Sequence, residues 1–175
     1  FLLIDYPGFG ECEGSASPES ILASSQSAWE HWQELYANQQ TPQIGILGHS
    51  LGASAALQLA ETILVERVVL LSPFTSVADM VKKMFGSWLI PLLQHRFENR
   101  GPLMQLLKRD PPPSITIIHG TRDEVIPVEM GRELAALNSE HIHYHELIHS
   151  YHNTILQDAL PKILQELQSI RELSD

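Results

Sequence analysis

Short runs rich in isoleucine, leucine and valine alternate along this chain with longer amphipathic segments. In the first four runs the apolar residues are nearly continuous, which is typical of strands buried on both faces. The alternation predicts an α/β fold, a mostly parallel sheet with helices on both of its faces. The predicted strands are Phe1–Tyr6, Gln43–Gly48, Arg67–Ser72, Ser114–Gly120 and Ile142–Ile148.

The segments between these strands carry helix signals. Ser17 followed by Pro18 is a favourable N-cap and first helical residue, and apolar side chains then recur at helical spacing. Further helices are predicted over Leu51–Leu64, over Val128–Leu137 and over about Asp158–Leu173. Because proline cannot sit in a helix interior, Pro161 requires the last helix to begin close to Asp158.

Charge and cysteine content exclude several classes of protein. The net charge of −10 argues against a nucleic-acid partner, because nucleic-acid binders present a basic face. Cys12 is the single cysteine, so no internal disulfide and no cysteine-based metal site can form. No signal-peptide pattern opens the sequence and no apolar run approaches the ~20 residues that span a bilayer, so we expect a cytoplasmic protein.

The length of the chain and its first residues set expectations about domain organisation. We expect residues 1–175 to form a single domain, since a chain of 175 residues can bury one sizeable core. The first predicted strand begins without an initiator methionine, so we expect the domain to lack N-terminal residues.

Residues 77–113 break the alternation of strands and helices. They contain the run Pro111-Pro112-Pro113 and six of the 11 basic residues, whereas residues 1–66 contain none. An irregular insertion between two core strands is typical of a lid or cap. Its apolar and basic residues are suited to an acyl chain or an anionic group, and to peripheral contact with a membrane surface, although core packing and ordinary surface lysines explain them equally well.

A nucleophile motif follows one of the predicted strands. Gly48-His49-Ser50-Leu51-Gly52 fits G-x-S-x-G and lies between a strand and an alanine-rich helix, as that motif requires. Glycines at both ends of the motif permit a sharp turn. Ser50 Oγ is then expected to project from the carboxyl edge of the sheet, where ligands bind in α/β folds. The N–H group of Leu51, at the start of the helix, is the expected donor to an oxyanion.

A serine nucleophile needs a base, and the base needs an orienting acid. Asp123 and His152 are the candidates, because each lies in a loop at the carboxyl end of a predicted strand. Glu124 and Asp79 are alternative acids, and His149 is an alternative base. His49 is expected to pack beside the nucleophile, and His119 to be a structural hydrogen-bonding histidine.

With these residues in place, the chain resembles the α/β-hydrolases along nearly its whole length. Asp5-Tyr6-Pro7-Gly8-Phe9-Gly10-Glu11-Cys12-Glu13-Gly14 is similar to the family's segment after its fourth strand, with Cys12 where serine is usual. Gly48–Gly52 matches the nucleophile elbow, residues 119–123 the acid loop and residues 152–153 the histidine loop. The chain is most similar to small serine-aminopeptidase-like esterases and protein-depalmitoylating thioesterases, although peptidases and lipases share these motifs.

The resemblance implies both an activity and a gap. The implied activity is hydrolysis of a carboxylic ester or thioester through an acyl-enzyme on Ser50, without a metal or other cofactor. Family members place three strands before the segment that begins at Asp5, and a loop among them gives the second oxyanion donor. We therefore expect that donor upstream of residue 1, and expect this chain alone to be poorly active or unstable, because one such donor contributes about 3 kcal/mol.

Two rival functions belong to other classes. His141, His143 and His145 would share one face of a strand. This arrangement is compatible with a zinc or copper metallohydrolase, or with an outer or edge strand whose polar face is exposed to solvent. A binding module with the same fold and no catalysis is the other rival. The residues point to a small-molecule or acyl-ester substrate but not to an oligomeric state.

Overall fold

The computed structural model describes residues 2–37 and 43–172, with side chains as far as residue 166. The chain forms two compact units, Phe1–Pro42 and Gln43–Asp175. None of the described helices is both long enough and apolar enough to cross a bilayer.

The first unit is built around one helix, α1 (Pro18–Leu35). The Ser17 hydroxyl accepts from Ser20 N at 3.1 Å and the Ser20 hydroxyl accepts from Ser17 N at 2.9 Å, a reciprocal cap that confirms the predicted start. Along α1, the rings of Trp29 and Trp32 stack with their centroids 5.2 Å apart.

The strand predicted over Phe1–Tyr6 is wrong for residues 2–6, and residue 1 lies outside the described residues. Residues 2–6 are apolar enough for a strand, but a strand exists only where its backbone pairs with a neighbour. None of them pairs in the described sheet, and they lead instead into a tight turn in which Phe9 N donates to Tyr6 O at 2.9 Å.

The second unit contains a parallel sheet of four described strands in the order β1-β2-β3-β4. In this register His49 lies beside Leu71, Leu71 beside Ile118, and Gly120 beside Leu147, so the carboxyl ends of the strands meet at one edge. The strands are β1 (Gly45–His49), β2 (Arg67–Leu71), β3 (Ser114–Gly120) and β4 (Ile142–Leu147). They confirm the other four predicted strands to within two residues at each end.

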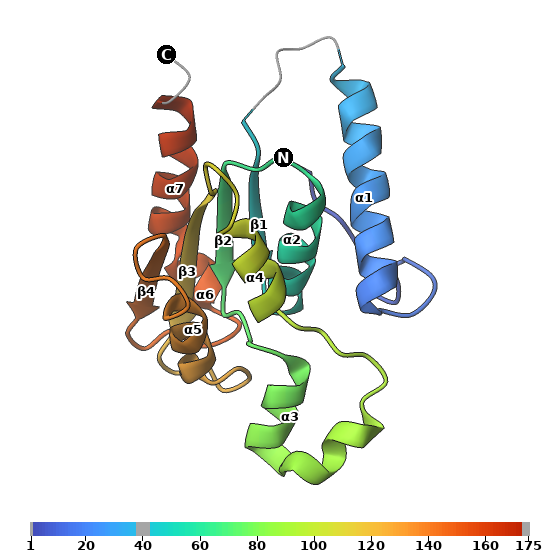
Figure 1. Cartoon of the computed structure of the whole chain (residues 1–175), viewed down its shortest axis with the longest axis vertical. Coiled ribbons are helices and arrows are strands. Elements are labelled where there is room, and N and C mark those ends of the chain that lie inside the picture. The colour runs from blue at the N-terminus through green and yellow to red at the C-terminus, as the bar shows by residue number, and fades with distance from the viewer. Residues whose placement is uncertain (1, 38–42, 173–175) are drawn as a thin grey trace. The chain divides into compact units, whose positions relative to one another are not determined.

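Helices cover both faces of this sheet, as predicted (Figure 1). On one face, Val68 and Ile115 pack among side chains of α2 (Leu51–Thr62), α4 (Arg100–Leu106) and α5 (Val128–Ala135). On the other, Val69 and Ile118 pack against α6 (Ile155–Asp158) and α7 (Leu160–Glu172). Alternate residues of a strand face opposite ways, and each fully buried valine or isoleucine stabilises the fold by roughly 1.5–3 kcal/mol.

The C-terminal helix predicted over about Asp158–Leu173 is confirmed as α7, with Pro161 in its first turn, and the short helix α6 precedes it and is separated from it at Ala159. Pro161 has no N–H to donate and its ring would clash with the carbonyl four residues earlier. The chain therefore ends α6 and starts α7 one residue before the proline. Leu173 lies outside the described residues.

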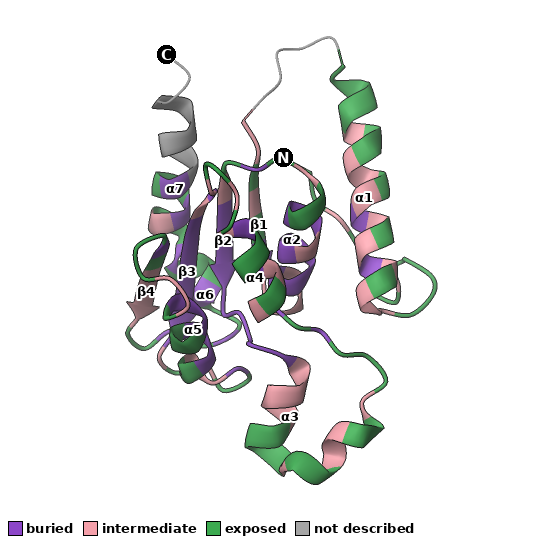
Figure 2. Cartoon of the chain, in the orientation of Figure 1, coloured by how far each residue is buried: buried purple, intermediate pink, exposed green. Residues whose placement is uncertain are grey.

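The predicted insertion over residues 77–113 contains three different parts. Residues 77–96, with α3 (Val77–Phe85) and the 3-10 helix η1 (Ser87–Leu92), include no buried residue and lie beyond the carboxyl edge of the sheet (Figures 1 and 2). The chain then returns beside its own departure, where Val77 N donates to Phe97 O at 3.0 Å and Asn99 N to Thr75 O at 3.0 Å. The third part, α4, belongs to the core, since Leu103 is fully buried.

Candidate active site

Ser50 lies in the turn between β1 and α2. Its backbone has φ 56° and ψ −120°, a sparsely populated conformation for a residue with a side chain. Its N–H donates to Leu71 O in β2 at 3.0 Å, which fixes the turn on the sheet. Ser50 is the N-cap of α2, but its hydroxyl makes no capping bond, in contrast to the hydroxyls of Ser17 and Ser76. The turn therefore strains the backbone of Ser50, and the Ser50 hydroxyl does not cap the helix.

Gly48 is required by the sharpness of this turn. A Cβ at position 48 would lie 2.2 Å from Gly52 O and 2.8 Å from Ala53 Cα, and both are backbone atoms that cannot rotate away. The predicted close approach of strand and helix is therefore present. After this turn α2 begins at Leu51, and the backbone N–H groups of the first helical residues have no acceptor within the helix.

Asp123 and His152 lie together, although 29 residues separate them. His152 Nδ1 is 2.8 Å from Asp123 Oδ2 and 3.0 Å from Asp123 Oδ1. The Asp123 side chain is fully buried and that of His152 is 8% exposed, so little water competes for this contact. Asp123 Oδ1 also accepts from the backbone N–H groups of Val125 at 3.0 Å and Ile126 at 2.7 Å.

These contacts decide the protonation of the pair. Burial alone would raise the pKa of Asp123, but hydrogen bonds from His119, from the Ile126 N–H and from His152 outweigh burial and hold the pKa well below its usual range. The carboxylate is therefore ionised at neutral pH and can only accept hydrogen bonds. In this contact His152 Nδ1 is therefore the donor, and Nε2 is the ring nitrogen that Asp123 does not contact.

The acid loop and the histidine loop are joined by backbone hydrogen bonds. Thr121 N donates to Leu147 O, and Arg122 N donates to Ser150 O, each at 3.0 Å. A Cβ on Gly120 would lie 2.3 Å from Ser150 O, so only glycine allows this approach. The contact between Asp123 and His152 therefore follows from the hydrogen bonds between the loops that come after β3 and β4.

Two histidines add contacts that the residue pattern alone did not reveal. His119 Nε2 is 3.0 Å from Ile126 O and 3.4 Å from Asp123 Oδ2, so this buried histidine supports the acid directly. Its predicted structural role is confirmed. The spacing of His119 four residues before Asp123 was the available signal, but only the fold shows the contact.

His49 lies against the candidate base. The ring centroids of His49 and His152 are 4.7 Å apart. Burial and the neighbouring His152 lower the pKa of His49, so its ring stays uncharged at neutral pH. Because His49 immediately precedes Ser50, this contact brings His152 to the Ser50 turn. Among the described residues, no hydrogen bond connects the Ser50 hydroxyl to His152.

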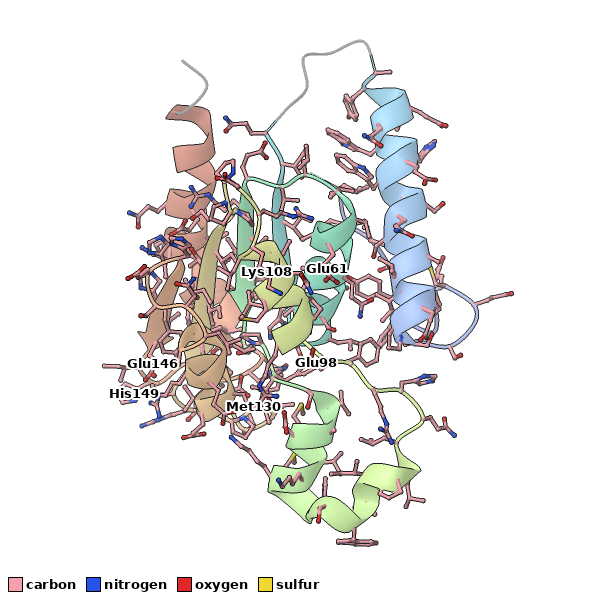
Figure 3. All side chains as sticks on the ribbon, in the orientation of Figure 1. Glu61, Glu98, Lys108, Met130, Glu146 and His149 are labelled. Carbon is pink, nitrogen blue, oxygen red and sulfur yellow. The ribbon has the colours of Figure 1, made fainter. Side chains whose placement is uncertain are left out.

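The alternative residues have other partners. Asp79 accepts hydrogen bonds from the hydroxyls of Thr75 and Ser76, at 3.0 and 2.7 Å, and pairs with Arg100. Glu124 Oε2 accepts from the backbone N–H of His152 at 3.3 Å and so holds the histidine loop. His149 follows β4, and its side chain is exposed (Figure 3). None of the three forms a carboxylate–imidazole contact like the one between Asp123 and His152.

The alternating histidines do not gather into a metal site in the part of the chain that the structure describes. His143 is exposed and His145 half-buried on β4, an edge strand of the described sheet. Across residues 2–37 and 43–172, no three His, Cys, Asp or Glu side chains are arranged to hold a metal ion.

Comparisons with known proteins identify the family of the chain. A family profile described as "Alpha/beta hydrolase family" matches residues 1–106. An uncharacterized protein of Mycobacterium tuberculosis is 28% identical over 172 residues, which cover 94% of this chain and 59% of that protein. The chain therefore spans less than two thirds of this relative.

Solved structures show the same fold. An esterase of Pyrococcus furiosus matches with a TM-score of 0.66 and 16% identity, over 96% of this chain and 67% of that one. The monoacylglycerol lipase of Paleococcus ferrophilus matches with a TM-score of 0.55 and 19% identity, over 85% and 73%. The match of the family profile to well over half of the residues shows that the chain belongs to the alpha/beta hydrolase family.

Proposed function

We propose that the protein is a serine hydrolase that cleaves a carboxylic ester or thioester through an acyl-enzyme on Ser50. The observation that carries this proposal is the buried contact between Asp123 and His152 Nδ1, which lies next to the turn that holds Ser50 and leaves Nε2 outside the contact. A buried, ionised carboxylate that orients an imidazole is the arrangement that activates a serine hydroxyl.

The proposed reaction has two halves. In the first, Ser50 Oγ attacks the carbonyl carbon of the substrate while His152 Nε2 takes the hydroxyl proton. The negative charge that develops on the carbonyl oxygen is stabilised by the N–H of Leu51. The bond to the leaving group then breaks, and His152 returns the proton to the departing alcohol or thiol.

In the second half, water replaces the serine. His152 takes a proton from the water as it attacks the acyl carbon, and the carboxylic acid leaves when the proton returns to Ser50 Oγ. Asp123 stays ionised throughout and stabilises the imidazolium that forms twice in each cycle. No step requires a metal or a redox cofactor.

Labelling by a fluorophosphonate probe tests the proposal. The full-length protein should be labelled, and Ser50→Ala should abolish the labelling. Ser54→Ala is a matched control, because Ser54 lies one turn further along α2 with a buried hydroxyl that has no hydrogen-bond partner. A full-length protein that the probe does not label, or a Ser50→Ala variant that it labels as strongly as the original, would instead indicate a binding module.

The substrate class is tested separately with p-nitrophenyl esters and thioesters of increasing acyl length. We expect rates that hold or rise as the acyl chain lengthens, because α3 and η1, which are rich in apolar residues, lie beyond the carboxyl edge of the sheet. A rate that falls steadily from the acetyl ester onward would contradict an acyl-chain substrate, while leaving the serine mechanism intact.

A further inference from the structure

Residues 77–96, which we call the excursion, expose large apolar side chains to solvent in the last turn of α3 and in η1. Met84 is 53% exposed, Phe85 58%, Trp88 73% and Leu92 72%. We call these four residues, together with Lys82 and Arg96, the tip. Monomeric proteins seldom group so many exposed large apolar side chains unless the surface meets a partner or a membrane.

The tip is fixed to the second unit by a buried neck. Residues 74–76 and 97–99 run side by side, and the buried Asn99 side chain donates to Phe74 O at 2.8 Å. Lys83 Nζ contacts Glu133 of α5 at 2.8 Å, which ties α3 to the body of the unit. The apolar surface is therefore presented on a defined support.

Charge distinguishes the tip from the rest of the chain. Residues 80–97 contain three basic residues and no acidic one, whereas all 21 acidic residues of the chain lie elsewhere, with only eight basic ones. Lys82 and Arg96 are exposed, and neither has an ion-pair partner among the described residues. An anionic surface would attract the tip and repel the remainder of the protein.

We propose that the tip docks the protein onto an anionic lipid bilayer. Trp88 and Phe85 enter the headgroup region, where an aromatic side chain gains from apolar contact, while Lys82 and Arg96 contact lipid phosphates. The excess of acidic over basic residues outside the tip favours this approach, in which the carboxyl edge of the sheet faces the membrane (Figure 1). Docking does not depend on the serine chemistry proposed for Ser50, because it uses neither Ser50 nor Asp123 nor His152.

Vesicle sedimentation with the full-length protein tests this proposal. The protein should sediment with vesicles of phosphatidylcholine containing phosphatidylserine, and much less with phosphatidylcholine alone. The double variant Lys82→Glu/Arg96→Glu should weaken binding by about tenfold or more, because each charge contributes severalfold near an anionic surface. Phe85→Ala/Trp88→Ala should weaken it similarly and should do so at high salt as well.

Matched control variants place the same changes away from the tip. Lys108→Glu reverses an exposed charge at the end of α4, and Leu64→Ala removes an apolar side chain that is 83% exposed beyond α2. Both should bind vesicles as the original protein does. Equal loss in these controls, or no sedimentation with anionic vesicles, would overturn the proposal. A tip-dependent dimer in sedimentation velocity without vesicle binding would assign the surface to a second copy.

A spectroscopic measurement reports insertion independently of affinity. Trp29→Phe/Trp32→Phe leaves Trp88 as the only tryptophan of the three in the chain. Lipids brominated near the headgroup should quench the fluorescence of Trp88 when anionic vesicles are added. Binding without quenching would show that the tip stays outside the bilayer and would contradict docking through Trp88. Because both experiments measure binding, their outcome is separate from that of the fluorophosphonate test.

Discussion

The loops at the ends of β3 and β4 and the tip of the excursion depart from the usual distribution of side chains in opposite ways. The loops bury polar groups, since the side chains of Asp123 and His119 are fully buried. The tip exposes apolar ones, since Trp88 and Leu92 are more than 70% exposed. Buried polar groups and exposed apolar patches are the two kinds of departure that carry information about function.

The two regions also differ in what holds them in place. Each oxygen of Asp123 has hydrogen-bonding partners, and Gly120 allows the two loops to approach closely. The tip rests on its neck, and all of its residues are exposed. In the functions proposed above, the loops hold atoms in place for chemistry, whereas the tip offers a surface to a membrane. It follows that substitutions in the loops should affect activity and stability strongly, whereas substitutions in the tip should leave the stability of the protein in solution nearly unchanged.

The largest expected effect is on activity, from Asp123→Asn. An amide at this position can donate to His152 Nδ1 and thereby favour the tautomer in which Nε2 carries the hydrogen. Nε2 would then no longer accept the serine proton, so kcat/KM for a p-nitrophenyl ester should fall by about 10⁴-fold with the full-length protein. Steady-state kinetics measure the fall.

Glu124→Gln is the matched control for this change. Glu124 also contacts the histidine loop, but through the backbone N–H of His152, and an amide oxygen can accept that bond equally well. Its kcat/KM should stay within severalfold of the original. A variant at Glu124 as impaired as the one at Asp123 would mean that Asp123 is not the orienting acid.

A second prediction concerns stability and addresses the contact between the loops. Gly120→Ala places a Cβ 2.3 Å from Ser150 O, and neither backbone can move without breaking the hydrogen bonds between the loops. The free energy of unfolding in urea should fall by about 3 kcal/mol or more. Gly101→Ala is the control, because its Cβ would meet the end of the flexible Glu98 side chain at 3.0 Å. Comparable losses in the two variants would show that the loops are not tightly packed.

Much of the sheet could be predicted because its signals are local. The strand Ser114–Gly120 is nearly continuous in β-branched residues and ends at a glycine, so both of its ends are marked. The elbow at Ser50 could be predicted because a glycine, a strand and an alanine-rich helix must occur together to form it. Residues 2–6 show the limit of such signals, because an apolar run predicts a strand whether or not a neighbour is available to pair with it.

Other features depend on packing between distant residues. His119 contacts Asp123 because Gly131 of α5 lies close to the other side of the imidazole, where a Cβ would be 2.5 Å from Nδ1. No local pattern encodes that approach. In the same way, the apolar residues of the excursion predict an amphipathic segment, but periodicity does not distinguish a face that packs on the core from one that meets solvent.

The third prediction is the pH dependence of stability. The folded state holds the pKa of Asp123 below its ordinary value near 4, so the unfolded chain binds this proton first as the pH falls. The stabilisation by Asp123 is complete above that ordinary value and is lost progressively below about pH 5, by about 2 kcal/mol. The free energy of unfolding in urea, plotted against pH between 3 and 7, should therefore have a shallower slope for Asp123→Asn than for the original protein. Identical slopes would mean that the carboxylate is not held ionised by its neighbours.

The smallest expected effect is at the tip. Trp88→Ala removes a side chain that is 73% exposed, so the free energy of unfolding of the protein without vesicles should change by less than about 0.5 kcal/mol. Leu103→Ala, 15 residues further along the chain in α4, removes a fully buried side chain and should lower the free energy of unfolding by about 2–5 kcal/mol. Urea unfolding of the two variants compares similar apolar truncations on opposite sides of the neck. If Trp88→Ala lowered the free energy of unfolding nearly as much as Leu103→Ala, the tip would be packed within the folded protein. The contrast between buried loops and an exposed tip would then be wrong.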